Sequence, residues 1–328
     1  MPPRPVLVVS LIAFGFLLLT GGHFHRDKIS SAVDKQRDYV RQTRRSRFNK
    51  VVCFGDSLSD AGNGAWLFTN RTWPKDTAVF ALTPTLTISP GQYVGHRFTN
   101  GPVYSEYVAQ TLGVPLISYA TGGASISHRV SSRSGEHGML PVDCIFEQIA
   151  KYSIGKTDES STLFIVYAGA NDAYFSLDEG GTPAEVLVDL KTAIQALRDI
   201  GGKYFVVPTL PPLGDNYPYA NALPKAAQPM YYFSTELRKL YLDWARKEKG
   251  IAIADFYSLY SRLMNSPEKY GFKREHLKEG CIGHSCADDW REYIWFDDYH
   301  PTTYVHSLLA DEALKSLDSL LWWNSGRV

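Results

Sequence analysis

Short apolar runs alternate with helix-length amphipathic segments along most of the chain. The clearest runs are Val51–Phe54, Leu116–Tyr119, Leu163–Tyr167, Tyr204–Val207 and Ile251–Ala254. Apolar runs of this length, bounded by turn-forming residues, are typical of buried strands. Because strands and helices alternate, the sequence predicts a parallel sheet covered by helices on both faces, the doubly wound α/β class.

The segments between these runs are predicted as helices or loops. Helices are expected over 103–112, 142–152, 183–200, 229–249 and 302–321. Residues 128–138, rich in Ser, Gly and His, are expected to form a loop.

The first apolar run ends in Gly55-Asp56-Ser57. A serine that follows a strand of a parallel sheet lies at the carboxyl edge, where open α/β sheets bind ligands. Such a serine is a nucleophile if a base reaches it. The alternative is that Asp56 and Ser57 only cap a helix, and this stretch alone does not separate the two interpretations.

A carboxylate and a histidine occur together near the other end of the chain. Asp297 precedes His300 by three residues, and Pro301 suits the first turn of the next helix. Asp297 can fold back onto one imidazole nitrogen and leave the other nitrogen for Ser57. The order Ser, Asp, His then supplies a nucleophile, an orienting carboxylate and a base. Asp298 is the competing orienting residue.

Four stretches together resemble the blocks of the GDSL, or SGNH, hydrolase family. They are Gly55–Asp60, Tyr119–Ala124, Gly169–Asp172 and Asp297–Pro301, and the resemblance runs from about residue 50 to about residue 321. It implies a flavodoxin-like parallel sheet, the SGNH hydrolase fold. It also implies ester hydrolysis by Ser57, His300 and Asp297, with neither a metal nor another cofactor.

The resemblance also implies an oxyanion hole, whose donors must be placed before the charge forms. The backbone amides of Ser57 and Gly123 and the side-chain amide of Asn171 are the expected donors. Gly123 is preferred over Gly122, and Asn171 as a mere turn residue is the alternative. A further stretch, Arg97–Gly101, resembles one that is common in a large branch of the family.

The composition bounds the partners. The 328 residues include 34 Lys and Arg and 34 Asp and Glu, so the net charge is near zero and nothing suggests nucleic acid. Aromatic residues make up 13% of the chain, which suits a groove for sugars or acyl chains but also an ordinary core.

The four cysteines and the histidines other than His300 are predicted to have structural rather than catalytic positions. Cys53 is predicted to be a buried free thiol, and Cys144 begins a predicted helix. A disulfide between Cys281 and Cys286 could close a short loop that contains His284, whereas a zinc site would need more regularly spaced ligands. The histidines expected in loops or on the surface are His96, His128, His137 and His306.

The N-terminal region predicts export. Residues 1–22 read as a signal peptide or signal anchor, 23–48 as a basic linker or pro-segment, and 49–324 as the hydrolase domain. Secretion is favoured because the basic residues that follow the apolar run oppose an anchor with an external domain. Asn70 begins the glycosylation pattern Asn-Arg-Thr, which matters only in an exported chain.

The expected function is a secreted serine esterase that acts through an acyl-enzyme. The resemblance is nearest to fungal secreted members that resemble carbohydrate acetylesterases. Aromatic loops without a long apolar lid segment also favour a short acyl group, such as acetyl, on a carbohydrate. A lipase or phospholipase acting on lipid esters is the alternative, and a non-catalytic binding protein on the same fold is a further one. The expected partner is a small-molecule ester, and a membrane only if the N-terminal segment is uncleaved.

Overall fold

The computed structural model describes residues 47–64, 97–134, 140–214, 217–283 and 289–323, which belong to a compact unit, Arg47–Val328. Several predictions from the sequence lie outside the described residues. They concern the segment 1–46, the helix expected after Ala65, the loop 73–96, Asn70, His96, His137, His284 and Cys286.

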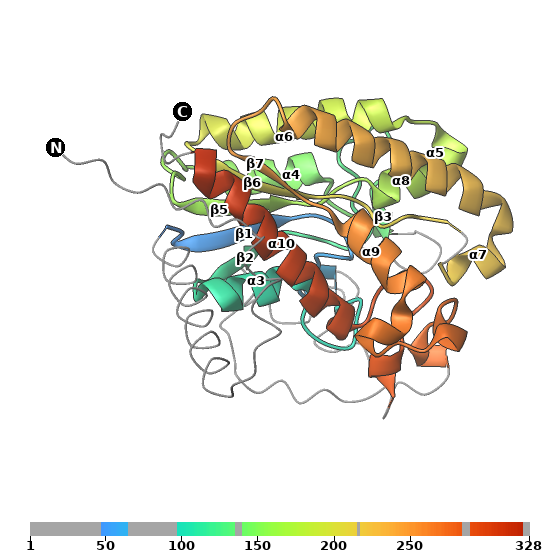
Figure 1. Ribbon diagram of the computed structural model, residues 1–328. Helices are drawn as coiled ribbons and strands as arrows, with labels where there is room; N and C mark the ends of the chain where they lie inside the picture. Colours follow the sequence, from blue (N-terminus) through green and yellow to red (C-terminus); the bar gives the residue numbers. More distant parts are fainter. Residues whose placement is uncertain (1–46, 65–96, 135–139, 215–216, 284–288, 324–328) are drawn as a thin grey trace, which may run out of the picture. The chain divides into compact units, whose positions relative to one another are not determined.

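Five parallel strands form the central sheet (Figure 1). They are β1 (Lys50–Phe54), β2 (Leu116–Ser118), β5 (Thr162–Val166), β6 (Tyr204–Pro208) and β7 (Ile251–Ala254). Their spatial order is β2-β1-β5-β6-β7. Counted along the chain, this is the 2-1-3-4-5 order of flavodoxin-like sheets, so the predicted doubly wound α/β fold is confirmed.

The register of the strands brings their carboxyl ends to one edge. Val52 lies opposite Ile117 of β2 on one side and Phe164 of β5 on the other. All five residues of β5 and of β6 are buried, because helices cover both faces of the sheet. This burial explains why the strands read as continuous apolar runs.

The helices form two layers. The described α-helices are α3 (Tyr104–Leu112), α4 (Ile145–Ser153), α5 (Ala170–Glu179), α6 (Pro183–Asp199), α7 (Tyr219–Ala222), α8 (Pro224–Ala245), α9 (Phe256–Asn265) and α10 (Thr303–Trp323). Helices α3, α9 and α10 pack together, and α4, α5, α6 and α8 form a connected group on the other face of the sheet (Figure 1).

Four helices differ from the predictions, among them the short helix α7, which was not predicted. Helix α8 begins at Pro224, and Pro229 lies inside it instead of starting it. Helix α5 was not predicted, because the Gly-Ala-Asn-Asp stretch resembles a turn. In the structure, Gly169 has a φ of 114° and directly precedes the first turn of α5. Helix α9 was also missed; the Asp255 side chain starts it by accepting a hydrogen bond from the Ser258 amide at 3.2 Å.

The expected loop over 128–138 is partly wrong. Its described part contains β3 (Arg133–Ser134), which pairs antiparallel with β4 (Leu140–Pro141). Strands of two residues are too short to show an alternating pattern, so the sequence does not predict the β3–β4 ribbon.

The prediction of a surface position for His306 is wrong. His306 is buried in α10, and its Nδ1 atom accepts a hydrogen bond from the Tyr104 amide at 3.3 Å. Burial lowers the pKa of His306 to about 3, with a smaller contribution from the charge of His300. His306 is therefore a neutral residue between α10 and α3.

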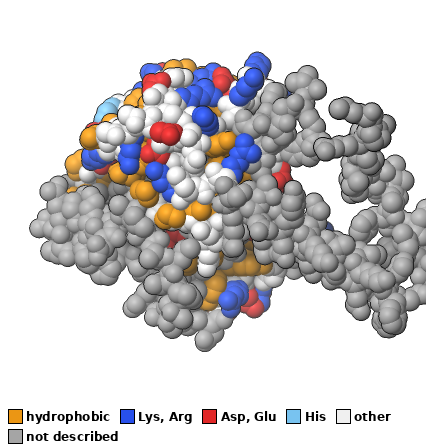
Figure 2. Space-filling view, turned by 90° about the vertical axis from the view of Figure 1, so that its left-hand side faces the viewer, with side chains coloured by type: hydrophobic (Ala, Val, Ile, Leu, Met, Phe, Trp, Pro, Cys, Tyr) orange, Lys and Arg blue, Asp and Glu red, His pale blue; other side chains and the backbone are white. Residues whose placement is uncertain are grey.

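The face of the molecule shown in Figure 2 mixes charges of both signs. In the view of Figure 2, Lys and Arg side chains lie interspersed with Asp and Glu side chains. Within the described ranges, the helices are too short or too polar to cross a membrane.

Candidate active site

The site lies at the carboxyl edge of the sheet, next to the boundary between β1 and β5. The chain leaves β1 toward β2 and leaves β5 toward β6, on opposite sides, so this boundary is the topological switch point. Ser57 follows β1 by three residues, and Asn171 lies in the first turn of the helix after β5. Doubly wound sheets bind their ligands in the crevice at this point.

Ser57, His300 and Asp297 form a hydrogen-bonded chain. The Ser57 Oγ atom lies 2.8 Å from His300 Nε2. The other imidazole nitrogen, Nδ1, lies 2.9 Å from Asp297 Oδ1 and 2.8 Å from Oδ2. Asp297, rather than the alternative Asp298, therefore contacts the imidazole. The arrangement suits a serine nucleophile whose base is oriented by a carboxylate.

The Asp297 carboxylate is held in its charged form. Burial acts to raise the pKa of Asp297, but the charge of His300 and its hydrogen bonds outweigh burial and lower the pKa below its usual range. The backbone amides of Tyr299 and His300 donate to Oδ1 at 2.8 Å and 2.7 Å. The folded loop thus fixes both the carboxylate and the imidazole.

Sequence reasoning missed the residues that hold this loop in place. The Thr99 hydroxyl donates to the carbonyl of Pro301 at 2.8 Å, and Asn100 Oδ1 accepts from the Thr303 amide at 2.8 Å. The Phe98 ring lies against the imidazole, with ring centroids 5.0 Å apart. Their signal was the family-like stretch Arg97–Gly101, to which no role was assigned.

A buried ion pair anchors the same stretch. Arg97 Nε and Nη2 donate to Glu106 Oε2 and Oε1 at 2.7 Å and 2.6 Å, a two-pronged contact with one carboxylate. Glu106 Oε2 also accepts from the Val103 amide at 2.9 Å. The start of α3 therefore fixes the segment that packs on His300.

Asp60 organises the stretch Tyr119–Ala124, called the glycine loop below, which contains Gly122 and Gly123. Its Oδ1 atom accepts from the amides of Gly62 at 2.8 Å and Asn63 at 2.6 Å, and its Oδ2 atom accepts from Gly64 at 2.9 Å and Gly122 at 2.8 Å. Burial raises the pKa of Asp60 to about 6, although the four amides oppose the rise. Because the Gly122 amide is bound to Asp60, it is not available to a substrate.

Gly123 has the backbone that only glycine adopts easily. Its φ is +87°, and a Cβ atom at this position would lie 2.1 Å from the carbonyl oxygen of Arg133. Its carbonyl accepts from the Arg133 amide at 3.2 Å. No acceptor for the Gly123 amide is found among the described residues. This amide is therefore the one in the glycine pair that a ligand can use.

Asn171 contacts the glycine loop directly. Its Nδ2 atom donates to the carbonyl of Ala124 at 3.0 Å, which leaves a second amide hydrogen for another acceptor. The adjacent Asp172 accepts from the Ile126 amide through both oxygens at 3.2 Å. The end of β5 and the glycine loop are thus joined by two side chains.

Asp56 stabilises the serine turn. It is fully buried, and its Oδ1 atom accepts from the Leu58 amide at 3.0 Å. Burial raises its pKa to about 7, against the opposing hydrogen bond from Leu58 and the charge of His300. Asp56 therefore has a structural position in the turn and does not bind the imidazole that Asp297 holds.

A hydrogen-bonded Ser-His-Asp chain is the catalytic arrangement of serine hydrolases, and here it lies at the switch point of a doubly wound sheet. The sequence profile of the GDSL-like Lipase/Acylhydrolase family matches residues 51–313. The chain belongs to this family, and it is a carboxylic ester hydrolase.

Individual relatives are distant. The chain is 27% identical over 303 residues to the thermolabile hemolysin of Vibrio parahaemolyticus, a match that covers 84% of this chain but only 65% of the hemolysin. It is 24% identical to the GDSL esterase/lipase At1g28640 of Arabidopsis thaliana, over 83% of this chain and 86% of the relative. Among solved structures, an acetyl xylan esterase from Geobacillus stearothermophilus aligns with a TM-score of 0.45 and 11% identity, over 85% of this chain and 97% of that chain.

Proposed function

We propose that ester hydrolysis by this chain proceeds through an acyl-enzyme formed on Ser57. The observation that carries this proposal is the 2.8 Å contact between Ser57 Oγ and His300 Nε2. In the first half-reaction, His300 takes the serine proton as Oγ attacks the ester carbonyl, and then gives that proton to the departing alcohol. In the second, water attacks the acyl group through the same base, which releases the acid and regenerates Ser57.

The oxyanion formed in each step needs donors. We assign this role to the backbone amides of Ser57 and Gly123 and to the side-chain amide of Asn171. The assignment is supported by the free state of the Gly123 amide among the described contacts and by the second hydrogen of Asn171 Nδ2. Donors already fixed by the fold require no reorganisation when the charge develops.

The substrate that we propose is a short acyl group, such as acetyl, on a carbohydrate. Aromatic side chains next to His300 support it. Tyr299 is 43% exposed, and its ring stacks on that of Tyr219 with centroids 5.5 Å apart and planes 6° apart. Tyr174 meets the same ring edge-on at 6.4 Å. Such amphipathic rings offer flat apolar faces and hydroxyl groups, both of which suit a sugar.

A lipid ester is the competing substrate, and one feature favours it. Leu223, Tyr231 and Tyr232 are exposed on the segment that follows α7. Helix α7 itself borders the catalytic loop, Asp297–Pro301, since the Tyr219 amide donates to the carbonyl of Asp298 at 3.2 Å. Exposed apolar side chains beside a catalytic loop can contact a lipid surface.

Two assays decide between these substrates. The first measures kcat/KM for nitrophenyl esters from acetate to palmitate, and the second compares acetylated oligosaccharides with phospholipid vesicles. A carbohydrate acetylesterase prefers acetate and releases acetate from the oligosaccharide. A preference for long chains together with release of fatty acid from vesicles would assign the lipid alternative. Absence of turnover on every ester, with Ser57→Ala as the blank, would assign a non-catalytic protein.

We also propose that the chain is exported. The apolar run within residues 1–22 supports this, and so does the spacing of Cys281 and Cys286. N-terminal sequencing and peptide mapping without reductant, on protein recovered from the medium, test both points. Free alkylation of both thiols in the folded protein would contradict the disulfide, and retention of the chain in the membrane fraction would contradict secretion.

A further inference from the structure

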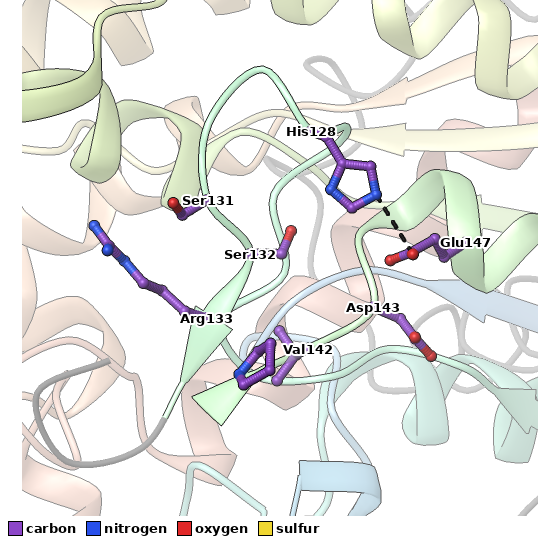
Figure 3. A pocket seen from close by; sticks show the side chains of 8 residues that line it. His128, Ser131, Ser132, Arg133, Val142, Asp143 and Glu147 are labelled. Atoms are coloured by element: carbon purple, nitrogen blue, oxygen red, sulfur yellow. Dashed lines mark ion pairs between the residues drawn. The ribbon is translucent and has the colours of Figure 1, made fainter. Parts of the chain in front are cut away.

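A second polar cluster, which contains none of the triad residues, lies beside a cavity of about 470 Å³. His128 and Glu147 line this cavity, and the His128 imidazole is turned toward the Glu147 carboxylate (Figure 3). The Cys144 thiol completes the cluster. One donor atom from each of the three residues lies within 4.8 Å of the other two.

The distances match those of a tetrahedral metal site. His128 Nε2 lies 3.4 Å from Glu147 Oε1 and 3.7 Å from Cys144 Sγ. Zinc binds nitrogen and oxygen at about 2.0–2.1 Å and sulfur at about 2.3 Å, so tetrahedral angles place N and O ligands about 3.4 Å apart and N and S ligands about 3.6 Å apart. The His128 nitrogen therefore already stands at nearly the separations from the other two donor atoms that zinc requires, and the Cys144 and Glu147 donor atoms lie within 4.8 Å of each other.

We propose that His128, Cys144 and Glu147 bind a zinc ion, with water as the fourth ligand. The mixture of imidazole, thiolate and carboxylate donors is typical of zinc. A thiolate and a carboxylate together neutralise the two charges of the ion. This proposal is independent of the ester hydrolysis proposed for Ser57.

The local structure orients two of the ligands in advance. Glu147 Oε2 accepts from the Cys144 amide at 3.0 Å, which leaves Oε1 directed at His128. Cys144 is the residue before the first turn of α4, where the helix N-terminus stabilises a thiolate. Binding of the ion breaks the S–H bond of Cys144, forms the S–Zn bond and releases one proton.

The site would also link α4 to the loop that carries Gly123. The amides of Ile145 and Phe146 donate to the carbonyls of Ser125 at 3.0 Å and Ile126 at 3.2 Å. A metal bound by His128 at the far end of this loop and by Cys144 would add a further link. Zinc should therefore raise the melting temperature of the whole chain.

Cobalt(II) titration of the full chain, after removal of metals with a chelator, tests the proposal. Cobalt bound by a thiolate gives a charge-transfer band in the near ultraviolet. We expect that band at one equivalent of cobalt, its loss on addition of zinc, and a higher melting temperature with zinc than with chelator. Cys144→Ser should abolish the band, and His128→Gln and Glu147→Gln should weaken binding at least about tenfold.

His276→Gln is the matched control, because His276 Nδ1 lies 3.2 Å from Glu279 Oε2 in a second histidine–glutamate pair. It should bind cobalt like the wild type. The His128 side chain is 69% exposed, so His128→Gln keeps the fold and makes the test decisive even if Cys144→Ser is unstable. Absence of the band in the wild type, or an unchanged band in His128→Gln, would overturn the proposal.

Discussion

The Asp60 carboxylate accepts a hydrogen bond from the Gly122 amide at 2.8 Å, so one side chain from the stretch Gly55–Asp60 holds the glycine loop. The same carboxylate binds the amides of Gly62, Asn63 and Gly64. The two stretches are separated along the chain but share this buried anchor. The position of the Gly123 amide relative to Ser57 therefore depends on a residue that does not itself contact the imidazole.

Replacement of Asp60 by Asn should lower kcat more than it changes KM. The amide group cannot accept on both sides as the carboxylate does, so the glycine loop shifts, and a misplacement of about 1 Å can cost about 10²-fold in rate. Steady-state kinetics on a nitrophenyl ester measure both constants. Asp158→Asn is the control, since Asp158 is an exposed turn aspartate that accepts from the Ser160 amide at 3.1 Å. Equal kcat values in the two variants would contradict this role of Asp60.

Replacement of Ser57 by Ala should abolish ester hydrolysis and leave the fold intact. The expected loss in kcat is on the order of 10⁶-fold, and His300→Ala should cause a comparable loss because members of a triad act as a unit. Circular dichroism and the melting temperature verify the fold. Unchanged turnover of a short-chain ester by the folded Ser57→Ala protein would exclude Ser57 as the nucleophile.

Replacement of Asn171 by Ala separates an oxyanion donor from a turn residue. Loss of one donor should reduce kcat by roughly 10²–10³-fold, about 3–4 kcal/mol of transition-state stabilisation. Loss of the contact with the Ala124 carbonyl alone would lower the melting temperature and leave the rate per folded molecule unchanged. If kcat of the folded variant stays within a few-fold of the wild type, Asn171 is structural.

Replacement of Gly123 by Ala should damage both stability and rate, because its Cβ atom would collide with the Arg133 carbonyl. Gly155→Ala is the matched control. Gly155 also has a positive φ, +70°, but nothing lies within 4 Å of the position that a Cβ atom would take there, so only the backbone strain of about 1–2 kcal/mol is expected. Chemical denaturation and kinetics of both variants give the comparison. Similar losses for the two would show that the close approach at Gly123 has no consequence.

The buried Asp56 should make stability depend on pH. Its pKa rises from about 3.9 in the unfolded chain to about 7 in the folded one, mainly through burial. The folded state therefore holds the proton more tightly, so this contribution is full below about pH 4 and is lost as the pH rises through 7. Asp56→Asn removes it. Urea denaturation from pH 4 to pH 7 should show a flatter curve for the variant, by at most about 1.4 kcal/mol per pH unit, and parallel curves would contradict the assignment.

The sequence predicts the sheet well because its strands are buried on both faces. The run that contains Phe164 is apolar throughout, and all five predicted strands occur at nearly their predicted positions. The order of the strands follows from the family resemblance, because the apolar runs themselves do not encode which neighbours pair. Short elements such as β3 and helix starts such as Gly169 depend on tertiary contacts, so local patterns did not reveal them.

The sequence predicted the catalytic residues of the site but not the residues that hold them in position. Ser57, Asp297 and His300 stand in recognisable motifs, and the structure brings them within hydrogen-bonding distance. Asn100 belongs to the family-like stretch Arg97–Gly101, but its residue type did not indicate that it positions the helix after His300. His128 and Cys144 are 16 residues apart with no regular ligand spacing, so only the folded loop shows that their donor atoms meet.

The nucleophile and its base are 243 residues apart in the sequence, near opposite ends of the domain's chain. A ribosome that adds about 5–20 residues per second exposes Ser57 roughly 12–50 s before His300 is even synthesised. During that interval the growing chain carries a serine without a base and cannot form an acyl-enzyme efficiently. Turnover of an ester therefore reports that translation has passed His300 and that the segment carrying His300 has folded against Ser57.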